Sequence, residues 1–68
     1  MDQSQLDEVR GLFASLTSDL EDAAGLAAEG QSHEIDAAAC LELVRGIRLT
    51  LRRTLDALRA IEALVAQS

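Results

Sequence analysis

The chain has 68 residues, of which 49% are hydrophobic, and a formal net charge of −6. This length allows one small domain, and the hydrophobic content is too high for a disordered chain. The single cysteine excludes an internal disulfide, and the acidic N-terminal sequence MDQSQLDE is the opposite of a signal peptide, so we expect a cytoplasmic protein.

The first predicted element is an amphipathic helix over about residues 4–28. Apolar residues recur in this segment at alternating steps of three and four, a heptad pattern that indicates one buried face. The series is Leu6, Val9, Phe13, Leu16, Leu20, Ala23 and Ala27. Ser4 followed by Asp7 is typical of a helix N-cap, and Gly30 is typical of a left-handed C-terminal cap.

A short turn over residues 29–32 is predicted next, with Ser32 as the N-cap of a second helix. The stretch GQSHEID contains the only histidine, His33, beside Glu34 and Asp36. Neighbouring residues at a helix start point in different directions, whereas a catalytic triad or a metal site needs side chains that converge. We therefore interpret the stretch as a hinge and expect no catalytic residue, no metal and no cofactor.

The rest of the chain predicts a second helix over about residues 33–66. Its apolar residues recur every seven positions in two parallel series. One series is Ala37, Val44, Leu51, Leu58 and Val65, and the other is Cys40, Ile47, Thr54 and Ile61. Gly46 weakens this helix by up to about 1 kcal/mol relative to Ala but does not end it.

Two amphipathic helices joined by a short turn predict an all-α, antiparallel two-helix hairpin. With these bounds the second helix is longer by about nine residues and overhangs the first by about 13 Å. A hairpin of this size is rarely stable alone, so we expect a homodimer that forms a four-helix bundle with coiled-coil packing. The expected self-association residues are Phe13, Leu16, Leu51, Leu58, Ile61, Leu64 and Val65. A different protein covering this surface is the alternative.

Charge is distributed unevenly along the chain. Residues 1–42 carry ten acidic residues and one Arg, a net charge of −9, whereas residues 43–68 carry two acidic residues and five Arg, a net charge of +3. These five arginines form a stripe in which Arg45, Arg52 and Arg59 recur every seven residues, with Arg48 and Arg53 beside them. Arginine binds phosphate groups through forked hydrogen bonds, so the stripe is a candidate nucleic-acid surface.

The predicted architecture resembles the Rop family of dimeric helical hairpins, whose members bind paired RNA loops. This resemblance implies an RNA-binding regulator that uses the arginine stripe. The residues themselves oppose this function, because a net charge of −6 repels nucleic acid and anionic membranes and no aromatic platform is present to stack bases. Glu42, Asp56 and Glu62 also alternate with the arginines at spacings typical of a self-paired helix face.

Protein binding is the class of function that remains. Leu43 and Leu49 lie among the arginines of the second helix, and an apolar spot with a charged rim is typical of a docking surface. We therefore predict a small cytoplasmic regulator or adaptor, not an enzyme, that binds a protein partner through the amphipathic surface of its bundle. The RNA-binding regulator and a structural subunit of a larger assembly remain as alternatives. No apolar run approaches the roughly 20 residues that span a bilayer, so we expect no membrane partner.

Overall fold

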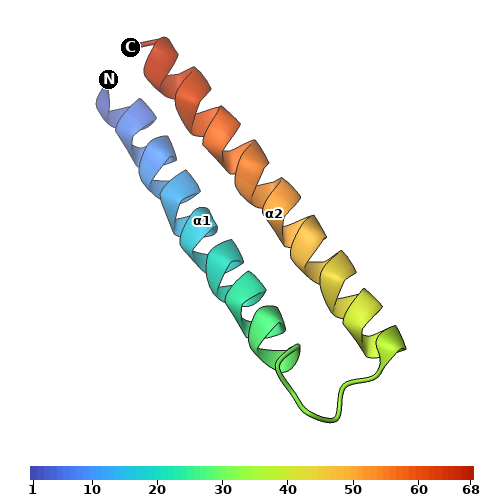
Figure 1. Cartoon of the computed structure of the whole chain (residues 1–68). Helices are drawn as coiled ribbons and strands as arrows, with labels where there is room; N and C mark the ends of the chain where they lie inside the picture. Colours follow the sequence, from blue (N-terminus) through green and yellow to red (C-terminus); the bar gives the residue numbers. More distant parts are fainter.

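The computed structural model describes residues 1–68 as two antiparallel α-helices joined by one turn (Figure 1). Helix α1 comprises Gln3–Glu29 and helix α2 comprises Ala37–Ala66. The two termini lie together at one end of the molecule, and the turn lies at the other end. The predicted all-α, two-helix architecture is confirmed. Neither helix is both long enough and apolar enough to cross a lipid bilayer.

Helix α1 begins at Gln3 because Asp2, and not the predicted Ser4, is its N-cap. The Asp2 carboxylate accepts a hydrogen bond from the Gln5 backbone N–H at 2.8 Å, and the Gln5 side-chain oxygen accepts one from the Asp2 backbone N–H at 2.9 Å. This reciprocal pair is a capping box, which satisfies two backbone donors at once. At the other end, Gly30 has a right-handed φ of −65°, so the predicted left-handed cap is wrong.

Helix α2 begins four residues later than predicted because Asp36, and not Ser32, is its N-cap. The Asp36 carboxylate accepts a hydrogen bond from the Ala39 backbone N–H at 2.8 Å. The Ser32 hydroxyl instead accepts one from the Glu34 backbone N–H at 3.3 Å, within the turn. Serine and aspartate are about equally good N-caps, so both choices satisfy the local rule. The turn therefore covers residues 30–36, and the predicted turn 29–32 is too short.

The longer turn removes the overhang that the sequence predicted. Helices α1 and α2 contain 27 and 30 residues, so their lengths nearly match. Ile61, near the end of α2, is 9% exposed and lies in one cluster with Val9 of α1. Leu64 packs against the same cluster. The prediction of an overhang is wrong because it assigned part of the turn to the second helix.

The core of the hairpin is small. Its buried apolar residues are Val9, Leu16, Ala57 and Ile61, against which the half-buried Leu12 and Leu64 pack. Thr50 and Thr54 are also buried, and their hydroxyls donate to the backbone carbonyls of Gly46 and Thr50 at 3.0 and 3.1 Å. These bonds lie within α2 itself, so the threonines enter the contact between the helices without leaving a buried polar atom unpaired.

Gly46 lies where the two helices approach each other closely. A Cβ atom at this position would be 3.0 Å from Cδ1 of Leu26, a separation at the lower limit of real contacts. The Leu26 side chain therefore packs against the bare backbone of α2. An alanine at this position would gain helix propensity but would require the Leu26 side chain to move.

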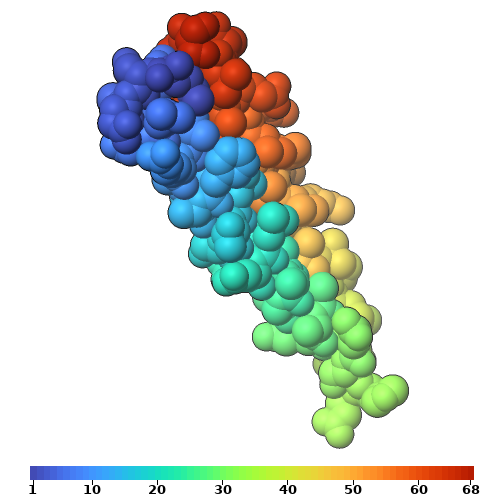
Figure 2. Space-filling view, turned by 90° about the vertical axis from the view of Figure 1, so that its left-hand side faces the viewer, coloured from blue at the N-terminus to red at the C-terminus, as the bar shows by residue number.

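The molecule is elongated rather than compact (Figure 2). Its Cα atoms extend over 51 × 14 × 10 Å, with a radius of gyration of 15.7 Å. A compact domain of this length has a radius of gyration of about 11 Å. Each helix therefore has one side against its neighbour and leaves most of its circumference at the surface.

Candidate interaction surface

Each helix carries a second apolar strip beside the strip that is buried in the hairpin. On α1 this strip contains Phe13 and Leu20, each 51% exposed. On α2 it contains five residues that are between 39% and 50% exposed: Val44, Leu51, Leu55, Leu58 and Val65. We call these seven residues the open apolar face.

The strips of α1 and α2 lie on the same side of the hairpin. Consecutive helical residues are rotated by about 100°, so Phe13 and Leu20 lie beside the buried strip of α1 in the same rotational sense as Leu51 and Leu58 lie beside that of α2. Because the two helices run in opposite directions, rotation in the same sense carries both strips to one side. The open apolar face is therefore a single surface made by two helices.

Two shallow grooves indent this surface along α2. The groove nearer the turn is lined by residues of both helices, including Ala27 of α1 and Cys40 and Val44 of α2. The next groove is lined by Val44, Ile47, Arg48 and Leu51. Because Ala27 and Val44 line one groove, the contacts agree with the rotational argument that both strips face the same side. Grooves between rows of helix side chains are where a packing helix inserts its own side chains.

The residues predicted for self-association fall into two groups in the structure. Phe13, Leu51, Leu58 and Val65 belong to the open apolar face. Leu16, Ile61 and Leu64 instead form or pack against the core between α1 and α2 of one chain. These three residues stabilise the hairpin itself, which corrects their assignment to a contact between chains. Each heptad series in the sequence includes residues of both the buried strip and the exposed strip, because the two strips are adjacent on each helix.

The apolar spot predicted around Leu43 and Leu49 is not present. Leu43 is half-buried near the turn, and its Cδ1 atom lies 3.7 Å from the position of a Cβ atom added to Gly30. Leu49 is 56% exposed and is rotated well away from both Leu43 and the open apolar face. Arginines nevertheless lie three and four residues from Leu49, at Arg45, Arg52 and Arg53. Leu49 is therefore an exposed apolar side chain surrounded by basic side chains.

Only part of the arginine stripe pairs within the chain. Arg45 lies 3.8 Å from Glu42, and Arg59 lies 3.5 Å from Asp56, in exposed ion pairs that contribute little to stability. Arg48, Arg52 and Arg53 form no ion pair in the chain. The predicted self-pairing of the stripe is confirmed for two of its five residues. Arg48 lies at the border of the open apolar face, where it lines a groove with Leu51.

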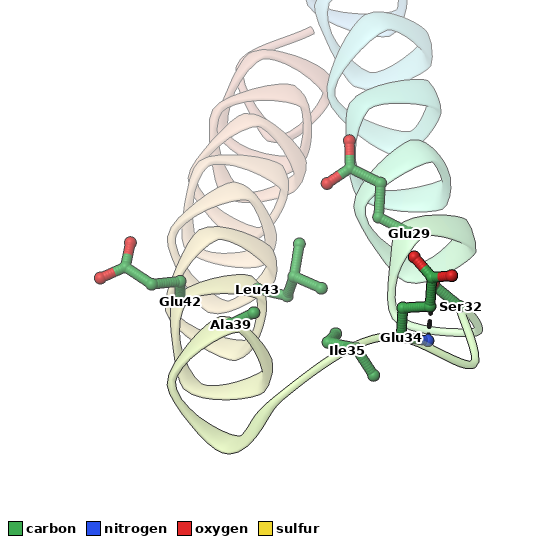
Figure 3. A pocket seen from close by; sticks show the side chains of 7 residues that line it. All are labelled: Glu29, Ser32, Glu34, Ile35, Ala39, Glu42 and Leu43. Atoms are coloured by element: carbon green, nitrogen blue, oxygen red, sulfur yellow. Dashed lines mark hydrogen bonds between the residues drawn. The ribbon is translucent and has the colours of Figure 1, made fainter.

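The stretch GQSHEID forms the turn, with His33 exposed at its surface. A hollow beside the turn is lined by seven residues from both helix ends and the turn: Glu29, Ser32, Glu34, Ile35, Ala39, Glu42 and Leu43 (Figure 3). The Glu42 carboxylate points away from those of Glu29 and Glu34. No group of three or more His, Cys, Asp or Glu side chains is placed to hold a metal ion. The candidate functional site is therefore the open apolar face and not the turn.

Comparison of the chain with protein family models, with curated proteins and with solved structures gives no match in any of the three.

Proposed function

We propose that the protein is a homodimeric interaction protein that acts as a regulator or adaptor and has no enzymatic activity. Two hairpins pair through their open apolar faces to form a four-helix bundle, and the outer surface of this bundle binds another protein. The observation that carries the proposal is the open apolar face itself, in which seven large apolar side chains from both helices are left at the surface. A continuous apolar surface of this kind marks a site of association.

The exposed area of the chain supports pairing. One chain of 7.3 kDa exposes 5002 Å². A compact monomer of this mass exposes about 4,200 Å². The difference, about 800 Å², matches the area that each partner buries in a protein–protein interface of standard size.

The small core also supports pairing. Only 6 of the 68 residues are buried in a single chain. The unfolded chain would expose about 10,600 Å², so folding of the isolated hairpin buries about half of this area, less than the roughly 60% usual for a domain of this size. Covering the open apolar face would add the hydrophobic stabilisation that the single chain lacks.

The mass of the protein in solution tests the pairing. Light scattering at micromolar concentration is expected to give about twice the chain mass of 7.3 kDa. The melting temperature is expected to rise with protein concentration, because association stabilises the folded state by mass action. A species of single-chain mass whose melting temperature does not depend on concentration would contradict the proposal.

The outer surface of the proposed bundle would carry the partner site. Leu49 and its surround of Arg45, Arg52 and Arg53 lie away from the open apolar face, so pairing leaves them exposed. An exposed apolar side chain surrounded by arginines is suited to a protein surface with an apolar pocket and an acidic rim.

Affinity capture from the native host tests this partner site. The immobilised protein is expected to retain a protein that Leu49→Gln loses, with no change in the mass of the dimer. Recovery of RNA instead, weakened by salt and abolished by replacing Arg45, Arg52 and Arg59 together, would support the nucleic-acid function over the protein partner.

A further inference from the structure

We infer that the two hairpins pair with their turns at the same end of the bundle, so that α1 of one copy lies against α2 of the other. This inference rests on the proposed pairing through the open apolar face. It adds the direction of pairing and identifies the residues that meet across the interface.

Two-fold symmetry allows two ways to place one open apolar face on another. An axis parallel to the helices sets the turns at the same end and brings α1 against α2 of the second copy. An axis perpendicular to the helices sets the turns at opposite ends and brings α1 against α1 and α2 against α2. The two arrangements bury the same apolar side chains, so the apolar area does not distinguish them.

The charges of the helices distinguish the two arrangements. Helix α1 contains six acidic residues and one Arg, a net charge of −5, whereas α2 contains three acidic residues and five Arg, a net charge of +2. Turns at opposite ends would place the acidic helices side by side and the arginine-rich helices side by side. Turns at the same end place each acidic helix beside an arginine-rich one, which is the electrostatically complementary choice.

One pair of residues at the border of the face makes this argument specific. Arg48 borders the α2 strip, and Glu21, rotated by about 100° from Leu20, lies on the flank of α1 that faces away from α2; both are exposed and neither forms an ion pair within the chain. The hairpin register, which sets Leu26 against Gly46, places Glu21 and Arg48 within about three residues of the same level, an offset of about 4.5 Å along the axis that two long side chains can span. With the turns at the same end, Glu21 of each copy therefore lies beside Arg48 of the other.

The apolar residues of the face also form layers in this arrangement. Phe13 lies about level with Leu58, and Leu20 about level with Leu51, so each layer combines an α1 residue of one copy with an α2 residue of the other. These layers repeat every seven residues, as in a coiled coil.

Cys40 provides a direct test because it is the only cysteine and lies exposed near the turn, beside the open apolar face. With the turns at the same end, the two Cys40 side chains lie at one end of the bundle. With the turns at opposite ends, they are about 35 Å apart along the axis, from the 1.5 Å rise of each helical residue. A short bismaleimide is therefore expected to cross-link the unmodified dimer, and Cys40→Ala is expected to abolish the product.

A mixture of two different chains tests directly for the arrangement with the turns at opposite ends, because only that arrangement gives a cross-link between the two chains. The unmodified chain is mixed with a mass-tagged Cys40→Ala/Gln67→Cys chain, whose thiol lies near the C-terminus. A cross-link between the two different chains is expected only if the turns lie at opposite ends. That product, or a dimer by light scattering that Cys40 does not cross-link, would overturn the inference and leave the proposed pairing intact. A protein with the mass of a single chain would overturn both.

Reversal of the Glu21 charge distinguishes the arrangements without a cross-linker. Glu21→Arg places two arginines together in the same-end arrangement and is expected to weaken dimerisation about tenfold, whereas adding Arg48→Glu is expected to restore it. In the opposite arrangement, Glu21→Arg would strengthen dimerisation by reducing repulsion between the acidic helices, a result that would contradict the inference. Asp22→Arg is the matched control, because Asp22 is exposed on the side of α1 away from the face and the same charge change is expected to spare the affinity.

Discussion

Leu16→Ala is expected to lower the free energy of unfolding by about 2–5 kcal/mol, a large part of the stability of a small domain. Leu16 is 7% exposed and belongs to a core whose other buried apolar residues are Val9, Ala57 and Ile61. So small a core offers few neighbours that can move into the space left by the leucine side chain. Urea denaturation followed by circular dichroism, at one fixed protein concentration, measures the effect.

Leu49→Ala is the matched control for this measurement. It removes the same atoms from a side chain that is 56% exposed and lies outside both the core and the open apolar face. Its effect is expected to stay within about 0.5 kcal/mol, as for other exposed positions. Equal losses for Leu16→Ala and Leu49→Ala would show that the contact between α1 and α2 is not the one described here.

The double substitution Leu51→Glu/Leu58→Glu is expected to abolish the dimer. The two leucines are 46% and 39% exposed in one chain, so the hairpin itself tolerates a change at their outer ends. In the proposed four-helix bundle they would lie between chains, and each carboxylate would lose its water without gaining a partner, at a cost of several kcal/mol. Light scattering is expected to show the mass of a single chain at concentrations where the unmodified protein is a dimer.

Leu49→Glu/Ala63→Glu is the control for the added charge. It introduces the same two carboxylates at exposed positions of α2 that lie away from the open apolar face. The control variant is expected to keep the dimer mass and a similar circular dichroism spectrum. A dimer that survives the Leu51/Leu58 change, or that is lost only in the control, would place the contact between chains on another surface.

The helices and their pairing could be predicted from local features of the sequence. Apolar residues at steps of three and four, with no proline in the chain, favour long amphipathic helices wherever they occur. A single short polar segment around His33 leaves one place for the chain to reverse. Two helices of this kind must then lie antiparallel, whatever the details of their packing.

The start of α2 could not be predicted from local rules. Ser32 and Asp36 are both good N-caps, so capping chemistry alone allows a helix that begins after either residue. Only the structure shows that the Asp36 carboxylate binds the Ala39 N–H and that Ser32 bonds within the turn. Because α2 starts later, Ile61 lies level with Val9. The C-terminal part of α2 therefore packs against α1 and does not extend beyond it.

The assignment of each apolar residue to the core or to the open apolar face was also decided by tertiary structure. Each helix has two adjoining apolar strips, and a heptad series includes members of both, so periodicity alone does not say which strip faces the neighbouring helix. Hydropathy favours Leu51 for the interior over Thr50, yet Thr50 is 3% exposed and Leu51 is 46% exposed. Thr50 can be buried because its hydroxyl bonds to the Gly46 carbonyl within its own helix, and this leaves the larger leucines at the surface. Two amphipathic helices and one chain reversal follow from the sequence alone, because these features depend on residues a few positions apart. The buried side of each helix depends on contacts between residues distant in the chain, so it becomes evident only when α1 and α2 are packed together.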